Sequence, residues 1–76
     1  MALENMRITW QVQPAHWSDL SAPDKARYAE IVASYGGGAQ QTARFRRYRA
    51  AELCAHSIRS VLGLEMTIGL VVPPGS

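Results

Sequence analysis

The chain is predicted to be a small α+β protein, a β-α-α-β two-layer sandwich in which two antiparallel strands pack against two helices. Three observations predict this fold. Residues 6–13 alternate between apolar and polar side chains, the middle of the chain carries apolar residues at helical spacing, and residues 65–72 alternate again. Two helices that run out and back return the chain to its starting side, so the strands can lie antiparallel beneath them.

The first predicted strand lies within "MRITWQVQ", residues 6–13. Met6, Ile8, Trp10 and Val12 share one face, while the residues between them are polar or charged. This period of two is typical of a half-buried strand. Pro14 is expected to end it, because proline has no N–H to donate to a neighbouring strand.

The first predicted helix spans residues 22–35. Ser21 and Asp24 have the spacing of a capping box, and the proline between them fits the first turn. Gly36 is expected to end the helix in the left-handed conformation. The apolar face of this helix consists of Tyr28, Ile31, Val32 and Tyr35.

The second predicted helix begins near Gln40 or Thr42 and runs to Leu62, with Gly63 as its C-terminal cap. Wound at about 3.6 residues per turn, it places its small and apolar residues on one stripe. That stripe consists of Ala43, Ala50, Ala51, Cys54, Ile58, Val61 and Leu62. We therefore expect Cys54 to be a buried residue of the core rather than a reactive thiol.

The last predicted strand lies within "EMTIGLVV", residues 65–72, where Met66, Ile68, Leu70 and Val72 share the apolar face. Prolines end this strand, and residues 73–76 are expected to form a flexible tail. We see no repeat and no internal linker, so residues 1–76 are predicted to form a single domain.

A sheet of two strands has two open edges and is only marginally stable by itself. A homodimer would relieve this by pairing residues 7–12 or 66–72 of two copies across a two-fold axis. The alternative is a monomer in which the 13–20 loop supplies additional strand pairing.

Composition excludes several classes of protein. Cys54 is the only cysteine, so the chain can form no internal disulfide and has no two-cysteine metal motif. The sequence shows no targeting signal and no apolar run long enough to span a membrane. We therefore expect a cytoplasmic protein that uses no cofactor and no metal, and that does not bind membranes.

Catalytic residues are scarce in the sequence. His16 and His56 are far apart, and Cys54 lies two residues before His56, a spacing that points the two side chains away from each other on a helix. "GGG" at residues 36–38 lacks the Lys-Ser/Thr of a phosphate-binding loop. We expect no enzyme activity.

The most distinctive stretch is "QQTARFRRYRAAELCAHSIR", residues 40–59. Four of the seven arginines lie between Arg44 and Arg49, with no acidic residue among them. Arginine and aromatic side chains together are typical of binding hot spots and of single-strand nucleic-acid platforms. The candidate partner-binding residues are Arg44, Phe45, Arg46, Tyr48, Arg49 and Arg59.

Two alternatives stay open for this stretch. If residue 45 is helical, Phe45 points outward and belongs to the binding surface; if the first turn is not helical, Phe45 turns into the core. The arginines in turn either dock a partner or form a solvated or internally paired face. Arg47 has the angle of the buried stripe, so its loss is expected to affect folding more than binding.

These features indicate a small non-catalytic protein-binding module, an inhibitor or adaptor that docks its Arg-aromatic surface on an acidic protein or nucleoprotein complex. The alternative is a nucleic-acid-binding regulator that uses the Arg44–Arg49 segment on phosphates, although the formal net charge of only +2 is low for that work. By analogy alone, small proteins without catalytic motifs are typical of phages and mobile elements, and anti-CRISPR proteins are one such group.

Overall fold

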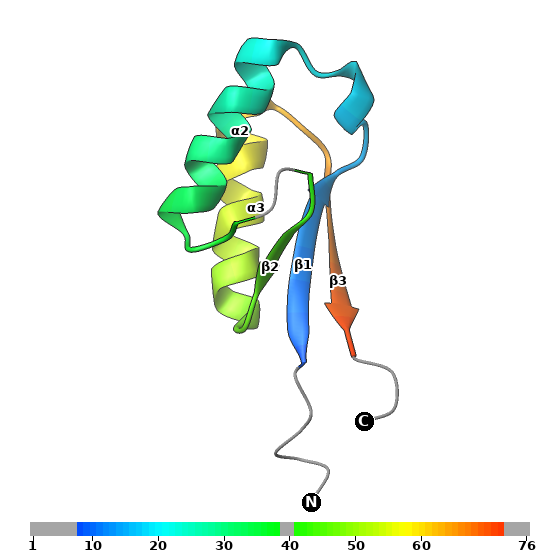
Figure 1. The fold of residues 1–76 in the computed structure, drawn as a ribbon, viewed down its shortest axis with the longest axis vertical. Coiled ribbons are helices and arrows are strands. Elements are labelled where there is room, and N and C mark those ends of the chain that lie inside the picture. Colours follow the sequence, from blue (N-terminus) through cyan, green and yellow to red (C-terminus); the bar gives the residue numbers. More distant parts are fainter. Residues whose placement is uncertain (1–7, 39–40, 73–76) are drawn as a thin grey trace, which may run out of the picture.

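The structure, a computed structural model, describes residues 8–38 and 41–72. Its strands are β1 (Thr9–Pro14), β2 (Ala43–Phe45) and β3 (Met66–Val71). Its helices are the short 3-10 helix η1 (Trp17–Asp19), α2 (Ala22–Ser34) and α3 (Tyr48–Leu62). Helices α2 and α3 cover one face of an antiparallel sheet (Figure 1), so the α+β class is confirmed. The predicted tail at residues 73–76 lies outside the described residues.

The sheet has three strands in the order β2-β1-β3, so the prediction of two strands was wrong. The additional strand, β2, comes from a segment that was predicted to be the start of the second helix. Its side chains alternate, with Ala43 and Phe45 buried and Arg44 exposed between them. Three residues give too short an apolar–polar alternation to predict a strand. The alanines and arginines around them favour a helix, and this preference dominated the prediction.

Two side-chain hydrogen bonds hold the entry to β2 in place. The Tyr28 hydroxyl of α2 donates to the Gln41 carbonyl oxygen at 2.8 Å. The Thr42 hydroxyl donates to Oε1 of Gln13 at 2.9 Å, which ties β2 to β1. β2 therefore depends on long-range contacts that no local pattern reveals.

β1 lies at the centre of the sheet, where Trp10 is opposite both Phe45 and Leu70, and Val12 is opposite both Ala43 and Ile68. The predicted apolar faces of the first and last strands therefore do meet on the side of the helices. Because Trp10–Val12 have strand neighbours on both sides, they offer no open edge and cannot provide the edge pairing expected of residues 7–12, of which Arg7 lies outside the described residues.

β1 ends at Pro14 as predicted, and Pro14 is itself the last paired residue, opposite Met66 in the ladder with β3. The Ala15 N–H donates to the Glu65 carbonyl oxygen, which shows that odd-numbered β1 residues direct their backbone polar groups toward β3. The nitrogen of Pro14 therefore points to the other side, beyond the end of β2, and no ladder hydrogen bond is lost there.

Helix α2 begins and ends close to the predicted positions. The Ser21 hydroxyl oxygen accepts a hydrogen bond from the Asp24 N–H at 3.3 Å, and the proline stands in the first turn. Gly36 follows the helix in the left-handed region, with φ of 90°. Tyr28 and Val32 are buried, whereas Tyr35 of the predicted apolar face is exposed.

Helix α3 runs across the sheet and has α2 packed against it. Ala51, Cys54 and Ile58 are buried as predicted, and Gly63 caps the helix with φ of 68°. Val61 differs from the prediction, because it lies toward solvent at the end of the helix. The core joins the sheet to both helices and consists of Val12, Tyr28, Val32, Ala43, Phe45, Ala51, Cys54, Ala55, Ile58 and Met66.

Helices α2 and α3 have 13 and 15 residues, and within the described ranges no helix has the length and apolar character needed to cross a bilayer.

Candidate docking surface

Five consecutive or near-consecutive residues surround the turn from β2 to α3, at the end of the sheet where α3 begins (Figure 1). We call Arg44, Arg46, Arg47, Tyr48 and Arg49 the arginine junction, and each of them is exposed. Arg44 is opposite Gln11 on the sheet face away from the helices, because its neighbours Ala43 and Phe45 point into the core. Arg46 and Arg47 form the connection, and Tyr48 and Arg49 start the helix.

Most of the positive charge at the arginine junction has no acidic partner among residues 8–38 and 41–72. In the part of the chain that the structure describes, the one ion pair joins Arg49 to Glu52, with Nη1 and Oε1 2.9 Å apart. Such an exposed pair contributes only about 0–1 kcal/mol to stability. Arg44, Arg46 and Arg47 have no carboxylate partner among the described residues, so their guanidinium groups are available to an anion.

The start of α3 adds to this positive field. Arg47 is the N-cap residue, its side chain makes no capping hydrogen bond, and the first turn contains no acidic residue. The free N–H groups at a helix start carry a partial positive charge, so each arginine beside them is unfavourable by about 0.3–1 kcal/mol. An anion bound here would interact favourably with both the helix end and the arginines.

Tyr48 connects the arginine junction to the sheet. Its ring meets the Trp10 ring edge to face, with centroids 4.7 Å apart and an interplanar angle of 70°. The Tyr48 side chain nevertheless remains 45% exposed. A ring held on one side and open on the other is suited to anchor a partner with little loss of conformational entropy.

Phe45 adopts the second of the two predicted alternatives, because residue 45 is in a strand and its side chain is only 5% exposed. It cannot contact a partner without unfolding of β2. Arg47 was predicted to face the core, and this is wrong. The helix begins only at Tyr48, so residue 47 does not occupy the helical position from which its inward direction was predicted.

Arg59 lies apart from the arginine junction. It is separated from Tyr48 by eleven residues of α3, which corresponds to about 16 Å along the helix axis. Its Nη2 donates to the Met66 carbonyl oxygen at 3.0 Å and so fastens α3 to the start of β3. The structure therefore brings together four of the six predicted partner-binding residues, Arg44, Arg46, Tyr48 and Arg49, and adds Arg47 to them, whereas Phe45 and Arg59 lie apart.

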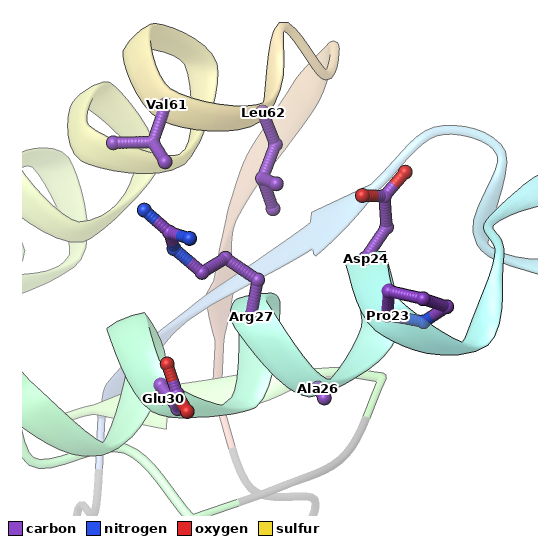
Figure 2. Close-up of a pocket in the computed structure, with 7 residues that line it drawn as sticks. All are labelled: Pro23, Asp24, Ala26, Arg27, Glu30, Val61 and Leu62. Carbon is purple, nitrogen blue, oxygen red and sulfur yellow. The ribbon is translucent and has the colours of Figure 1, made fainter.

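A cleft of about 380 Å³ lies between α2 and the end of α3. Figure 2 shows Arg27 of α2 extending toward Val61, with Asp24 and Glu30 on the same helix and Leu62 above them. Sequence reasoning missed this cleft, and the unexpected exposure of Val61 belongs to it. None of its charged side chains is buried, so the cleft lacks the enclosed polar groups that give a small-molecule site its specificity.

The residues considered for catalysis are not assembled into a site. His16 and His56 are exposed, and Cys54 is fully buried. Burial raises the pKa of the Cys54 thiol to about 11, which leaves it protonated and unreactive near neutral pH. Burial, with a smaller contribution from Cys54, also raises the pKa of Tyr28 to about 12. Over residues 8–38 and 41–72, no three His, Cys, Asp or Glu side chains are grouped so as to hold a metal ion.

No protein family model, no curated protein and no solved structure matches the chain.

Proposed function

We propose that the protein is a non-catalytic binding module, an inhibitor or adaptor, that docks the arginine junction on an acidic surface of a partner protein or nucleoprotein complex. The observation that carries this proposal is the exposure of Arg44, Arg46 and Arg47 without a carboxylate partner among the described residues. Like charges gathered at a helix start are unfavourable for the free chain. Binding to an acidic partner offsets this repulsion, and the relief contributes to the free energy of binding.

The geometry of the junction suits carboxylate recognition. A guanidinium group can hold both oxygens of a carboxylate through two parallel hydrogen bonds, and it is more weakly hydrated than an ammonium group. Tyr48 supplies an apolar contact beside these charges, since its ring is held by Trp10 and open to solvent. Arginine and tyrosine are enriched among the residues that dominate binding energy at protein interfaces.

The burial of Phe45 favours a protein partner over a single-stranded nucleic acid. Single-strand platforms present several rings on which successive bases stack. At the arginine junction the Phe45 ring is buried, and one side of the Tyr48 ring is occupied by Trp10. Nucleic-acid binding is therefore the second candidate, and the experiment below separates the two.

The site of action that fits this proposal is the cytoplasm. The chain has one cysteine and depends on no disulfide, so a reducing compartment imposes no cost on its stability.

A charge-matched pair of variants tests the docking proposal. Arg46→Ala/Arg47→Ala removes two charges from the junction, and Lys25→Ala/Arg27→Ala removes two charges from α2. Tagged parent and variants are incubated with a nuclease-treated lysate of the cells that produce the protein, and a captured protein is purified and titrated. We expect the junction variant to raise Kd by about tenfold or more, whereas the α2 variant stays within about twofold of the parent.

Circular dichroism and thermal melting of each variant show whether a loss of binding reflects a loss of fold. Equal affinities for the parent and a folded junction variant would contradict the proposal. A labelled single-stranded oligonucleotide of about 20 nucleotides is titrated in parallel. Binding of this oligonucleotide that weakens steeply between about 50 and 200 mM salt, with no captured protein, would replace the proposed partner by nucleic acid.

A further inference from the structure

The edge of β3 away from β1 has no strand partner among the described residues and presents a defined set of backbone hydrogen-bonding groups. Glu65 accepts from Ala15, so in this ladder the odd-numbered residues of β3 face β1. The N–H and C=O groups of Ile68 and Leu70 therefore point away from the sheet. The Met66 carbonyl oxygen points the same way and is occupied by the Arg59 guanidinium.

Apart from Arg59 at the Met66 carbonyl oxygen, this edge lacks the features that keep strand edges from pairing. Charged residues, prolines and bulges are the usual protection, and Met66–Val71 (MTIGLV) has no charge and no proline. Its six residues pair with β1 without interruption. Leu70 and Val72 next to the edge are 51% and 50% exposed, on the same face as the buried core.

Gly69 lies in the middle of β3, and no contact among the described residues requires a glycine at this position. A Cβ built there would meet its nearest neighbours, the Cγ and Nε2 atoms of Gln11, at 3.8 Å, which is an ordinary contact. Its φ lies outside the left-handed region. A glycine in a strand is destabilising by about 0.5–1 kcal/mol relative to alanine, and it often marks a place where another backbone approaches closely.

We propose that β3 pairs with β3 of a second copy in antiparallel fashion, with Gly69 on the two-fold axis, to give a continuous six-stranded sheet. This register places Ile68 opposite Leu70 of the second copy, and the outward groups of these two residues form the ladder. Met66 lies opposite Val72 of the second copy, where the Arg59 bond to the Met66 carbonyl oxygen can remain. The half-exposed Leu70 and Val72 side chains gain apolar neighbours.

Charge distribution favours a second copy as the occupant of this edge. No residue of β3 is charged, so two β3 strands can pair without electrostatic repulsion. For the same reason β3 has no charged side chain that could attract a charged strand of another protein. The sheet order β2-β1-β3 places the arginine junction at the opposite edge, so the two junctions of such a dimer stay far apart. Pairing through β2 would instead bring the arginines of both copies together. The dimer does not depend on the proposed docking function.

The first test measures the mass of the full chain by sedimentation or light scattering over a wide range of concentrations. We expect a mass of twice 8.4 kDa at the upper end and dissociation on dilution. Leu70→Pro should abolish the dimer while leaving the fold intact, because the Leu70 N–H points outward and is not used in the ladder with β1. A constant mass of 8.4 kDa for the parent, or a folded Leu70→Pro variant that still dimerises, would overturn the proposal.

The second test examines the register by oxidative cross-linking. In the proposed pairing the two thiols introduced by Gly69→Cys lie directly opposite each other, with Cα atoms about 4.5 Å apart, within the range of a disulfide. The matched control Thr67→Cys has the same orientation, but its two copies lie about 13 Å apart along the strands. Cys54 is fully buried and should not compete. We expect rapid covalent dimer formation by Gly69→Cys only, and equal rates for both variants would overturn the register.

Discussion

At the scale of single residues, Phe45 and Arg47 show how one boundary decides the role of several side chains. Both roles were predicted from helical angles, and those angles require the helix to include residue 45. Because α3 begins at Tyr48, Phe45 becomes the last residue of a strand and points into the core, and Arg47 becomes an exposed N-cap. The sequence therefore identified the residue types available for binding. The direction of each side chain could not be predicted, because it depends on whether the residue lies in a strand, a turn or a helix.

The position of Arg47 yields a stability prediction. Asp, Asn and Ser are preferred N-cap residues because their side chains accept hydrogen bonds from the free N–H groups, which arginine cannot do. Arg47→Asp should raise the free energy of unfolding by about 0.5–2 kcal/mol, measured by urea denaturation.

Arg46→Asp is the matched control for this prediction, because it makes the same change in charge one residue before the cap. A comparable gain from both variants would show that relief of charge, not capping, is responsible. Arg47→Asp should at the same time weaken partner binding, so stability and docking are expected to change in opposite directions.

Cys54 yields a prediction about pH. Burial raises its pKa from 9.0 to about 11 in the folded chain, so the folded state favours the protonated thiol. The resulting stability is fully present below pH 9 and is lost as the pH rises through about 11. Cys54→Ala should lower the free energy of unfolding at neutral pH but should flatten its decline over this alkaline range.

Urea denaturation at several pH values between about 8 and 11 measures both effects. The Tyr28 hydroxyl, whose pKa is raised to about 12 by burial and to a smaller extent by Cys54, is present in both proteins and accounts for the alkaline decline that Cys54→Ala retains. If parent and Cys54→Ala decline with the same slope, ionisation of the thiol is not coupled to folding.

At the scale of elements, the first and last strands of the chain and α2 were predictable because each has a complete local signal. β1 and β3 show an uninterrupted period of two, and α2 has a serine cap at its start and a glycine at its end. β2 has only three residues, and its stability comes from pairing with β1 and from the bonds made by Tyr28 and Thr42. Such long-range contributions have no signature in a short window of sequence.

The connection from α2 to β2 is sterically constrained at only one of the last two glycines of "GGG". A Cβ on Gly37 would lie 2.7 Å from Cγ1 of Val32 and 2.9 Å from Cζ of Phe45. A Cβ on Gly38 would meet nothing within 4 Å. The two glycines therefore have different roles, although their sequence context is the same.

Gly37→Ala should lower the free energy of unfolding by about 1–3 kcal/mol, since an overpacked side chain must displace Val32 or Phe45. Gly38→Ala should have little effect or should stabilise slightly, because it restricts the unfolded chain without a clash. Thermal melting of the two variants is sufficient to compare them. Equal melting temperatures would mean that the turn moves away from the core to accommodate the methyl group.

At the scale of the whole molecule, the candidate surface was predictable in composition but not in extent. The run of arginines was visible in the sequence, and the fold keeps most of it together because the β2–α3 connection is short. Arg59 was grouped with it only because a continuous helix was assumed. The open edge of β3 could be anticipated from residues 66–72, whereas the central position of β1 required knowledge of the third strand.

The antiparallel pairing of Thr9 with Val71 has a consequence for how the chain is made. During synthesis β1 leaves the ribosome first, yet its longer ladder forms only with the last strand to emerge. Until then Trp10 and Val12 have only the three residues of β2 as a strand partner, together with whatever part of α3 has been completed. The ladder between β1 and β3 can therefore form only after β3 has been synthesised, and until then the edge of β1 that pairs with β3 has no strand partner among the described residues.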